Sequence, residues 1–215
     1  MIKLDLDKKN NLHILYVGSH SDDIEIGCGG TLLKWLEEGK IKQVDWVIFS
    51  ADEIRKKEAE KSAKMFTHNR CELNLFINNF RDSFLPYIGA EVKDYFLSIK
   101  TDINPDIIFT HYRKDLHQDH RFISDLTHNL FRDHLILEYE IPKYDSDLGN
   151  PNVFVQLDEN IIENKLANIQ ACFQSQKENH WFSKKKLSAL NILRGIESNN
   201  LNTYTEAFFC NKMIL

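Results

Sequence analysis

Long hydrophobic runs, paired cysteines and an excess of positive charge are all missing from this sequence of 215 residues. The longest apolar stretches, such as 14–17 and 107–109, fall far short of the ~20 residues that span a bilayer, so we expect no insertion into a membrane. The N-terminal segment MIKLDLDKKN mixes acidic with basic residues and has no apolar stretch, which argues against a signal peptide.

The four cysteines form no C-x-x-C pair and no metal-knuckle spacing, so we expect buried, reduced thiols in a cytoplasmic protein. Lys and Arg number 27 against 32 Asp and Glu, a net charge of -5, and binding to nucleic acids needs the opposite sign. With only 8 Gly and 4 Pro, the composition excludes collagen-like, low-complexity and disordered chains.

The length predicts one domain over residues 1–215, at roughly 150 residues per domain. Short β-branched runs alternate with helical patterns through most of the chain. Five strands are expected near 13–17, 44–50, 73–77, 105–110 and 135–139. This order predicts an α/β fold, a Rossmann-like, mostly parallel sheet sandwiched by helices.

The pattern changes after Pro142, where a polar loop begins. Beyond that loop we expect a strand near 153–157, helices near 161–173 and 184–195, and an extended end at 204–210. We therefore expect residues 1–142 to build the core sheet and a metal site, and residues 143–215 to form an elaboration that shapes the pocket.

Two clusters of histidine and aspartate come directly after predicted strands. GSHSDD follows the first strand at 18–23, and HYRKDLHQDH follows the fourth at 111–120. Ligands of open α/β sheets bind at the carboxyl ends of the strands, so we expect both clusters to face one crevice.

Zinc chemistry explains this combination of residue types. A catalytic zinc takes three imidazole or carboxylate ligands and keeps one position open. His20 and Asp23 are three residues apart, as are His117 and His120, a spacing that places two side chains on one side of a helical turn. The alternative for each cluster is a hydrogen-bonded histidine or an Asp that caps a helix; two clusters together favour the metal site.

The sequence resembles a known family at these clusters. GSHSDDIEIGCGGTL is similar to the (A/S)H-x-D-D-x-E-x-G-x-G-G-T segment of the PIG-L, or LmbE-like, zinc N-deacetylases, and DLHQDHR is similar to their H-x-D-H segment. Residues 55–58 resemble the R-x-x-E motif, and 173–176, 194–195 and 204–208 resemble the later F-x-S-Q, R-G and Y-A-E-A-F elements. Ser21 departs from the family, since many members have proline there.

The resemblance implies roles for seven residues. One zinc ion per chain would be held by His20, Asp23 and His120. Asp22 would be the general base. His117 would be a protonated imidazole that stabilises the oxyanion or protonates the leaving amine, and Asp119 would orient His117 and keep it charged. Arg55 would bind a sugar hydroxyl or a phosphate, although it could instead pair with Glu58 on a solvated helix.

The implied activity is zinc-dependent removal of an N-acetyl group from an N-acetylated amino sugar or sugar conjugate, with release of acetate. One alternative is a metallophosphoesterase, which needs ligands from further clusters that the sequence does not show. Another is a sugar-binding α/β domain with a structural metal. The partner is then a small N-acetylated sugar. A homo-oligomer is compatible with the sequence, which does not determine the oligomeric state.

Several other residues allow both a functional and a structural interpretation, or favour the structural one. Asp82 could line the crevice or cap a turn, and Glu206 could lie behind the site or point outward along a strand. Tyr112 could contact the oxyanion, but an exposed loop position is favoured. We expect His111 to belong to the scaffold and Gly27–Gly30 to form a turn close to the metal-bearing loop.

Overall fold

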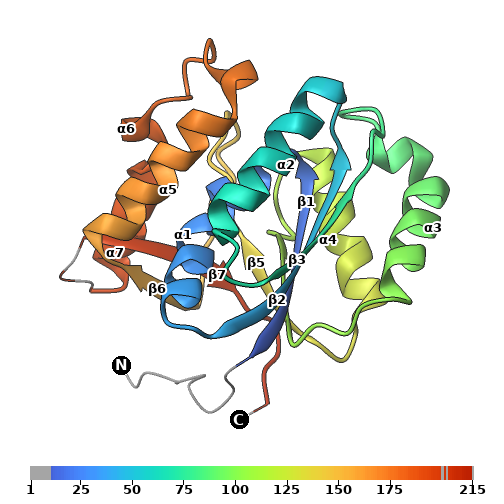
Figure 1. Ribbon diagram of the computed structural model, residues 1–215, viewed down its shortest axis with the longest axis horizontal. Helices are drawn as coiled ribbons and strands as arrows, with labels where there is room; N and C mark the ends of the chain where they lie inside the picture. Colours follow the sequence, from blue (N-terminus) through green and yellow to red (C-terminus); the bar gives the residue numbers. More distant parts are fainter. Residues whose placement is uncertain (1–10, 200, 202, 215) are drawn as a thin grey trace.

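The computed structural model describes residues 11–199, 201 and 203–214. The N-terminal segment MIKLDLDKKN, and residues 200, 202 and 215 of the expected 1–215 domain, lie outside the described residues. The fold is a seven-stranded sheet with helices on both faces, as Figure 1 shows, so the predicted Rossmann-like α/β class is confirmed. Its strands are β1 (Leu12–His20), β2 (Ile41–Ser50), β3 (Glu72–Ile77), β4 (Ile107–His111), β5 (Leu135–Tyr139), β6 (Val153–Leu157) and β7 (Tyr204–Phe209).

The helices connect these strands in the alternating order that the sequence predicts. They are α1 (Asp23–Glu37), α2 (Glu53–Thr67), α3 (Gly89–Lys100), α4 (Gln118–Leu130), α5 (Glu159–Cys172), α6 (Lys184–Leu187) and α7 (Ala189–Glu197), with short 3-10 turns η1 (Leu85–Ile88) and η2 (Gln174–Gln176). Among the residues that the structure describes, no helix combines the length and the apolar character needed to cross a membrane.

The strand order β3-β2-β1-β4-β5-β7-β6 divides the sheet into two parts. Strands β1 to β5 all run parallel to one another. Strand β7 runs antiparallel to both β5 and β6. The C-terminal elaboration therefore continues the same sheet, because its two strands extend the edge that β5 would otherwise leave open.

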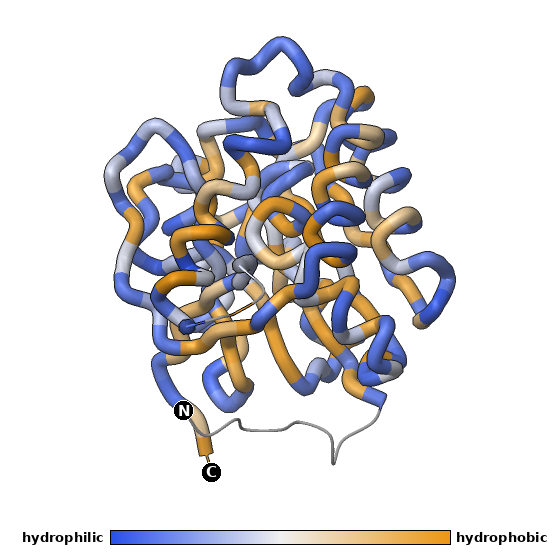
Figure 2. Tube along the Cα trace, turned by 90° about the vertical axis from the view of Figure 1, so that its left-hand side faces the viewer, coloured by the Kyte–Doolittle hydropathy of each residue, from blue (hydrophilic) through white to orange (hydrophobic). Residues whose placement is uncertain are grey.

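Each face of the sheet has its own hydrophobic core, because successive side chains of a strand point to opposite faces. On β1, Ile14 and Tyr16 pack into the core with α1, α2 and α5, whereas Leu15 and Val17 pack into the core with α3 and α4. Figure 2 shows the hydrophobic stretches of the trace running through its middle, while its outer turns are mostly hydrophilic.

The expectation of a turn at Gly27–Gly30 was wrong, since these residues lie inside α1, which begins at Asp23. The glycines are explained by packing. A Cβ on Gly27 would lie 2.2 Å from the ring of Tyr139, and one on Gly29 would lie 2.7 Å from Phe66. Glycine lets α1 approach the sheet and α2 this closely, and the surrounding contacts outweigh its poor helix propensity.

Candidate metal centre and active site

The two predicted clusters meet where the strand order of the sheet reverses. Strand β1 ends at His20 and the adjacent β4 ends at His111, with β2 and β3 on one side and β5 on the other. A crevice at the carboxyl ends of parallel strands opens at such a switch point, because the connections on its two sides leave in opposite directions. The topology therefore places His20 beside residues that are about a hundred positions away in sequence.

The three residues expected to bind zinc converge. His20 Nδ1 lies 3.2 Å from His120 Nε2 and 3.3 Å from Asp23 Oδ2. Asp23 Oδ1 in turn lies 3.5 Å from His120 Nε2. All three side chains are buried. Two imidazole nitrogens and a carboxylate are a donor set that suits a zinc ion with an open fourth position.

Carboxylates hold the outer nitrogen of each of these imidazoles. Asp115 Oδ2 lies 3.0 Å from His120 Nδ1, and Asp119 Oδ2 and Asp82 Oδ1 each lie 3.3 Å from His20 Nε2. A carboxylate at the outer nitrogen keeps the proton there and leaves the lone pair of the inner nitrogen for a metal. Both inner nitrogens, His20 Nδ1 and His120 Nε2, point into the same cluster.

The charges around His20 also favour a cation. Burial opposes protonation of this imidazole, but the charge of Asp23, together with the hydrogen bonds that His20 donates to Asp119 and Asp82, raises its pKa well above the ordinary value. Burial likewise disfavours the charged form of Asp23, yet His120, His111 and His20 hold its pKa well below the ordinary value. Asp23 is therefore an anion within the cluster, as a carboxylate ligand of a metal must be.

Asp115 is a residue whose role the sequence did not reveal. Its Oδ2 also accepts from Lys143 Nζ at 2.8 Å, and its Oδ1 accepts from the backbone N–H of His117 at 2.7 Å. Burial would raise its pKa, but the contacts with His120 and Lys143 outweigh burial and lower it to about 2. The sequence feature that could have pointed to this role is the position of Asp115 in the DLHQDH segment, five residues before His120.

Asp22 occupies the N-cap position of α1, but its side chain makes no capping hydrogen bond. The helix-capping alternative therefore does not account for this residue. Burial and the neighbouring Asp23 raise the pKa of Asp22 to about 6, while His20 and Arg55 act in the opposite direction. The result is a carboxylate beside the ligand cluster with a raised affinity for a proton, as a general base requires.

His117 lies against both histidines of the cluster, with ring centroids 5.0 Å from His20 and 4.5 Å from His120. It is the N-cap of α4, and its Nδ1 accepts from the backbone N–H of Asp119 at 3.3 Å. Burial and the nearby imidazoles of His120 and His20 lower its pKa. A neutral ring that accepts at Nδ1 carries its proton on Nε2.

Among the described contacts no hydrogen bond joins the side chains of Asp119 and His117, although the charge of Asp119 acts to raise the pKa of His117. The Asp119 oxygens accept from the backbone N–H groups of Ser83 and Leu85, at 2.8 and 3.2 Å, and Oδ2 faces His20. The physical reason is the loop after β3, whose amide groups are brought against α4 by the fold. Burial, His120 and His20 nevertheless outweigh Asp119 and lower the pKa of His117, so a protonated imidazole stays a prediction.

His111 also lies in the cluster, as a fully buried part of the scaffold. Its Nε2 accepts from the backbone N–H of Ser19 at 2.9 Å and lies 3.3 Å from Asp23 Oδ2, and its ring stacks on His120 with centroids 4.0 Å apart. Burial and the positive charge of His120 lower its pKa to about 4. A neutral His111 can therefore accept the Ser19 bond and support the ends of β1 and β4.

Arg55 and Asp82 stand at the mouth of the site. Arg55 Nη1 lies 3.1 Å from Asp82 Oδ2, and the other oxygen of Asp82 faces His20. The structure supports the interpretation that Asp82 lines the crevice. The alternative pairing of Arg55 with Glu58 is not what the described contacts show, because Glu58 binds the backbone N–H and hydroxyl of Ser175, at 2.8 and 2.6 Å.

Glu206 points into the protein and holds α1. Its carboxylate accepts from the backbone N–H groups of Gly30 and Thr31, at 2.8 and 2.6 Å. Lys165 Nζ lies 2.7 Å from Glu206 Oε1 and 2.7 Å from the carbonyl of Ile26. The interpretation that Glu206 simply faces outward is therefore wrong.

Comparison with known proteins gives one family match and several fold matches. Residues 15–131, more than half of the chain, match the family described as PIG-L: GlcNAc-PI de-N-acetylase. The structure is similar to N,N'-diacetylchitobiose deacetylase from Pyrococcus horikoshii, solved with an inhibitor, with a TM-score of 0.74 and 23% identity over 96% of this chain and 86% of that one.

Two further structures share the fold. An antimicrobial-reagent pseudoaglycone deacetylase aligns with a TM-score of 0.72 and 16% identity, over 93% of this chain and 97% of that one. The 4-carboxy-2-hydroxymuconate hydratase GalB from Pseudomonas putida KT2440 aligns with a TM-score of 0.65 and 16% identity, over 95% and 98%. At these identities the likeness establishes the architecture, which serves more than one reaction.

Proposed function

The chain belongs to the PIG-L family, and on that premise we propose that it is a zinc-dependent hydrolase that removes the acetyl group from an N-acetylated amino sugar or sugar conjugate. One observation carries the proposal. Three metal-binding side chains, His20, Asp23 and His120, meet within 3.5 Å of one another beside Asp22, which makes no capping hydrogen bond to its helix.

The donor set favours one metal ion. Each of the three groups of side chains that could hold an ion, among the described residues, contains His20 or His120, with donor atoms within 4.8 Å of one another. These groups therefore describe a single cluster and not two independent sites, which supports a deacetylase over a two-metal phosphoesterase. When bound by His20, Asp23 and His120, zinc would supply Lewis-acid activation of the amide carbonyl and of water.

The side chains around the cluster divide the proton transfers. Asp22 takes a proton from the attacking water as the tetrahedral centre forms, and its raised pKa makes it able to pass that proton to the leaving amine. His117 donates from Nε2 to the oxyanion, because its Nδ1 is already occupied by the Asp119 N–H. Acetate and the free amine are the products.

Arg55 is proposed to bind the substrate outside the reacting amide. Its guanidinium is about one-third exposed and reaches the site through Asp82, so both groups present hydrogen-bonding atoms at the mouth. A sugar hydroxyl can accept from Arg55 and donate to Asp82, which makes this ion pair suitable for binding a sugar ring.

The test combines metal analysis with product analysis. Purified protein would be assayed for acetate release from N-acetylglucosamine, N,N'-diacetylchitobiose and a nucleotide-linked N-acetylglucosamine, and for phosphate release from a phosphate monoester. We expect one zinc per chain and acetate release that a chelator abolishes and zinc restores. Two metals per chain with phosphate release would identify an esterase. One retained metal with neither product across the panel would contradict the proposed hydrolase.

A further inference from the structure

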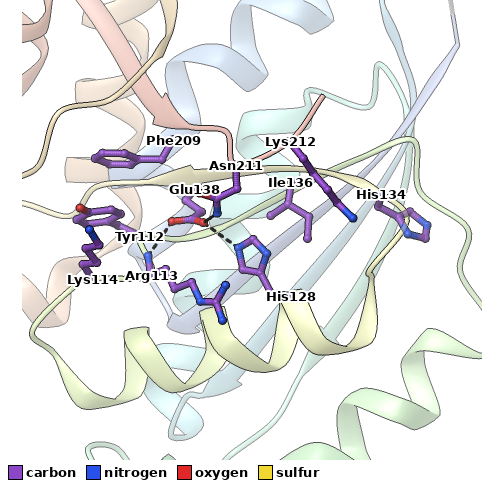
Figure 3. A pocket seen from close by; sticks show the side chains of 10 residues that line it. All are labelled: Tyr112, Arg113, Lys114, His128, His134, Ile136, Glu138, Phe209, Asn211 and Lys212. Carbon is purple, nitrogen blue, oxygen red and sulfur yellow. Dashed lines mark hydrogen bonds and ion pairs between the residues drawn. The ribbon is translucent and has the colours of Figure 1, made fainter. Parts of the chain in front are cut away.

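A cavity lies outside the candidate site. Its volume is ≈ 530 Å³, within the range of small-molecule pockets, and none of the candidate ligands or catalytic residues lines it. Figure 3 shows its side chains coming from α4, β5, the loop after β4 and the segment after β7. Ile136 forms part of its floor, on the face of the sheet that α3 and α4 cover.

Basic side chains dominate the charge of this cavity. Arg113, Lys114 and Lys212 line it together with two histidines, and Glu138 is its one carboxylate among the described residues. This excess of positive charge runs against the net charge of -5 of the whole chain. An excess of cations gathered around a concave surface attracts an anionic ligand.

The single carboxylate offsets only one of the three cations, and among the described residues it forms no ion pair with the side chain of any of them. Glu138 is 2% exposed. Its Oε1 accepts from His128 Nε2 at 2.8 Å and from Asn211 Nδ2 at 2.7 Å, and its Oε2 accepts from the backbone N–H of Arg113 at 2.8 Å. Glu138 thus holds α4, the loop after β4 and the C-terminal segment around the cavity.

The cations keep donors for a ligand. Arg113 binds Asp125 through Nε at 2.8 Å, which leaves its two terminal nitrogens without a partner among the described residues. Lys114 makes no hydrogen bond or ion pair within the part of the chain that the structure describes. Lys212 donates to the carbonyl of Arg132 and keeps its charge.

An aromatic wall closes one side of the cavity. The rings of Tyr112 and Phe209 stack with centroids 3.9 Å apart and planes 13° apart. Tyr112 lies in the loop after β4, as expected, but it is half-buried by this stacking and not exposed. Such a wall offers apolar surface to the organic part of a ligand.

From these observations we propose that the cavity binds a phosphate-bearing anion with at least two negative charges, through Arg113, Lys114 and Lys212. Phosphate oxygens are suited to guanidinium and ammonium donors. In Figure 3, Lys114 and Lys212 lie toward opposite sides of the group of lining side chains, with Arg113 between them, which suits a ligand with more than one anionic group. The proposal concerns this surface alone and does not depend on the deacetylation chemistry.

The experiment is calorimetric titration of the full chain with pyrophosphate, with adenosine diphosphate and with uncharged adenosine. Saturable binding of either phosphate, weakened at least about tenfold by Lys114→Glu, is the expected result, because the substitution replaces a charge-assisted contact with a repulsive charge. Tighter binding of adenosine diphosphate than of pyrophosphate would identify an organic phosphate as the occupant, and equal binding a free inorganic one.

Two further variants make the test specific. Lys212→Glu should weaken phosphate binding as Lys114→Glu does. Lys93→Glu is the matched control, because Lys93 is an exposed lysine on α3, outside the cavity, and the same change of charge there should leave the affinity unchanged. No saturable binding, equal losses in Lys93→Glu and Lys114→Glu, or equally tight binding of adenosine would each overturn the proposal.

Discussion

The parallel half of the sheet and the C-terminal segment 143–209 contribute different things to one site. The candidate ligands and proton-transfer groups all lie between His20 and His120, at the ends of parallel strands. The later segment contributes partners for residues of the parallel half, namely Lys143 for Asp115, Ser175 for Glu58, and Lys165 and Glu206 for α1. The proposed chemical groups are thus concentrated in short strand-end motifs, whereas the contacts that position them are distributed over residues far apart in the sequence.

One ion pair from each region shows a difference in burial. Arg55 and Asp82, which face the site mouth, have side chains that are 31% and 49% exposed. Lys165 and Glu206, which join α5 and β7 to α1, are each 1% exposed. A buried pair is costly to break and an exposed pair is not, so substitutions in the two regions should produce different losses.

The largest effect is expected from Asp22→Asn, in the parallel half. Turnover should fall about 10²–10⁴-fold, because the amide cannot accept the proton of the attacking water. Zinc content should stay near one per chain, since Asp22 is not among the proposed ligands. Acetate release and metal analysis check both points. Asp94→Asn, an exposed change on α3, is the control, and unchanged turnover in Asp22→Asn would remove this residue from the mechanism.

Next is Lys165→Met, in the C-terminal segment. It leaves Glu206 buried without its cation and should lower the free energy of unfolding by about 3–5 kcal/mol, measured by urea denaturation. Adding Glu206→Gln should recover part of the loss, because the uncompensated charge is gone. Lys93→Met, at an exposed site, should change little. A loss below about 1 kcal/mol would show that this pair does not hold α1 to the elaboration.

Lys143, Asp115 and His120 form one series of hydrogen bonds that joins the two regions. Replacing Asp115 or Lys143 by alanine compares how much each region contributes to zinc binding. Asp115→Ala should weaken zinc binding about 10–100-fold, because the outer nitrogen of His120 loses the carboxylate that fixes its tautomer. Lys143→Ala should weaken it less than tenfold, since the lysine acts only through Asp115. Competition with a chelator measures both affinities. Equal losses would mean that the later segment, and not the strand-end motif, orients His120.

The smallest effect is expected from Ser175→Ala. The hydroxyl is exposed, and the backbone N–H of Ser175 also donates to the Glu58 carboxylate, so one of the two hydrogen bonds remains in the variant. Loss of the hydroxyl should therefore lower the free energy of unfolding by about 1 kcal/mol or less. Urea denaturation measures the stability, and turnover should remain close to that of the parent protein. A loss of turnover comparable to that of Asp22→Asn would give the later segment a part in the chemistry.

Most of the fold and the ligand cluster could be predicted from local patterns. Short β-branched runs alternating with helices predicted the strands of the sheet, and His and Asp directly after two of them predicted a shared edge. The alternation of strands and helices can be recognised from local sequence. The rule that crossovers between parallel strands are right-handed then leaves few ways to arrange these strands in a sheet. Asp23 and His120 are brought together by that topology, and their positions as proposed ligands follow from it.

The sequence by itself determined the α/β class and the strand ends at which polar side chains gather, because periodicity and residue type act over a few neighbouring residues. Only the tertiary structure decided which groups contact each other. It placed Gly27 inside a helix against Tyr139, turned Asp119 toward His20 and the backbone of Ser83, and assigned Asp115 to His120. These outcomes depend on long-range packing, in which a close contact or a competing N–H group outweighs local propensity.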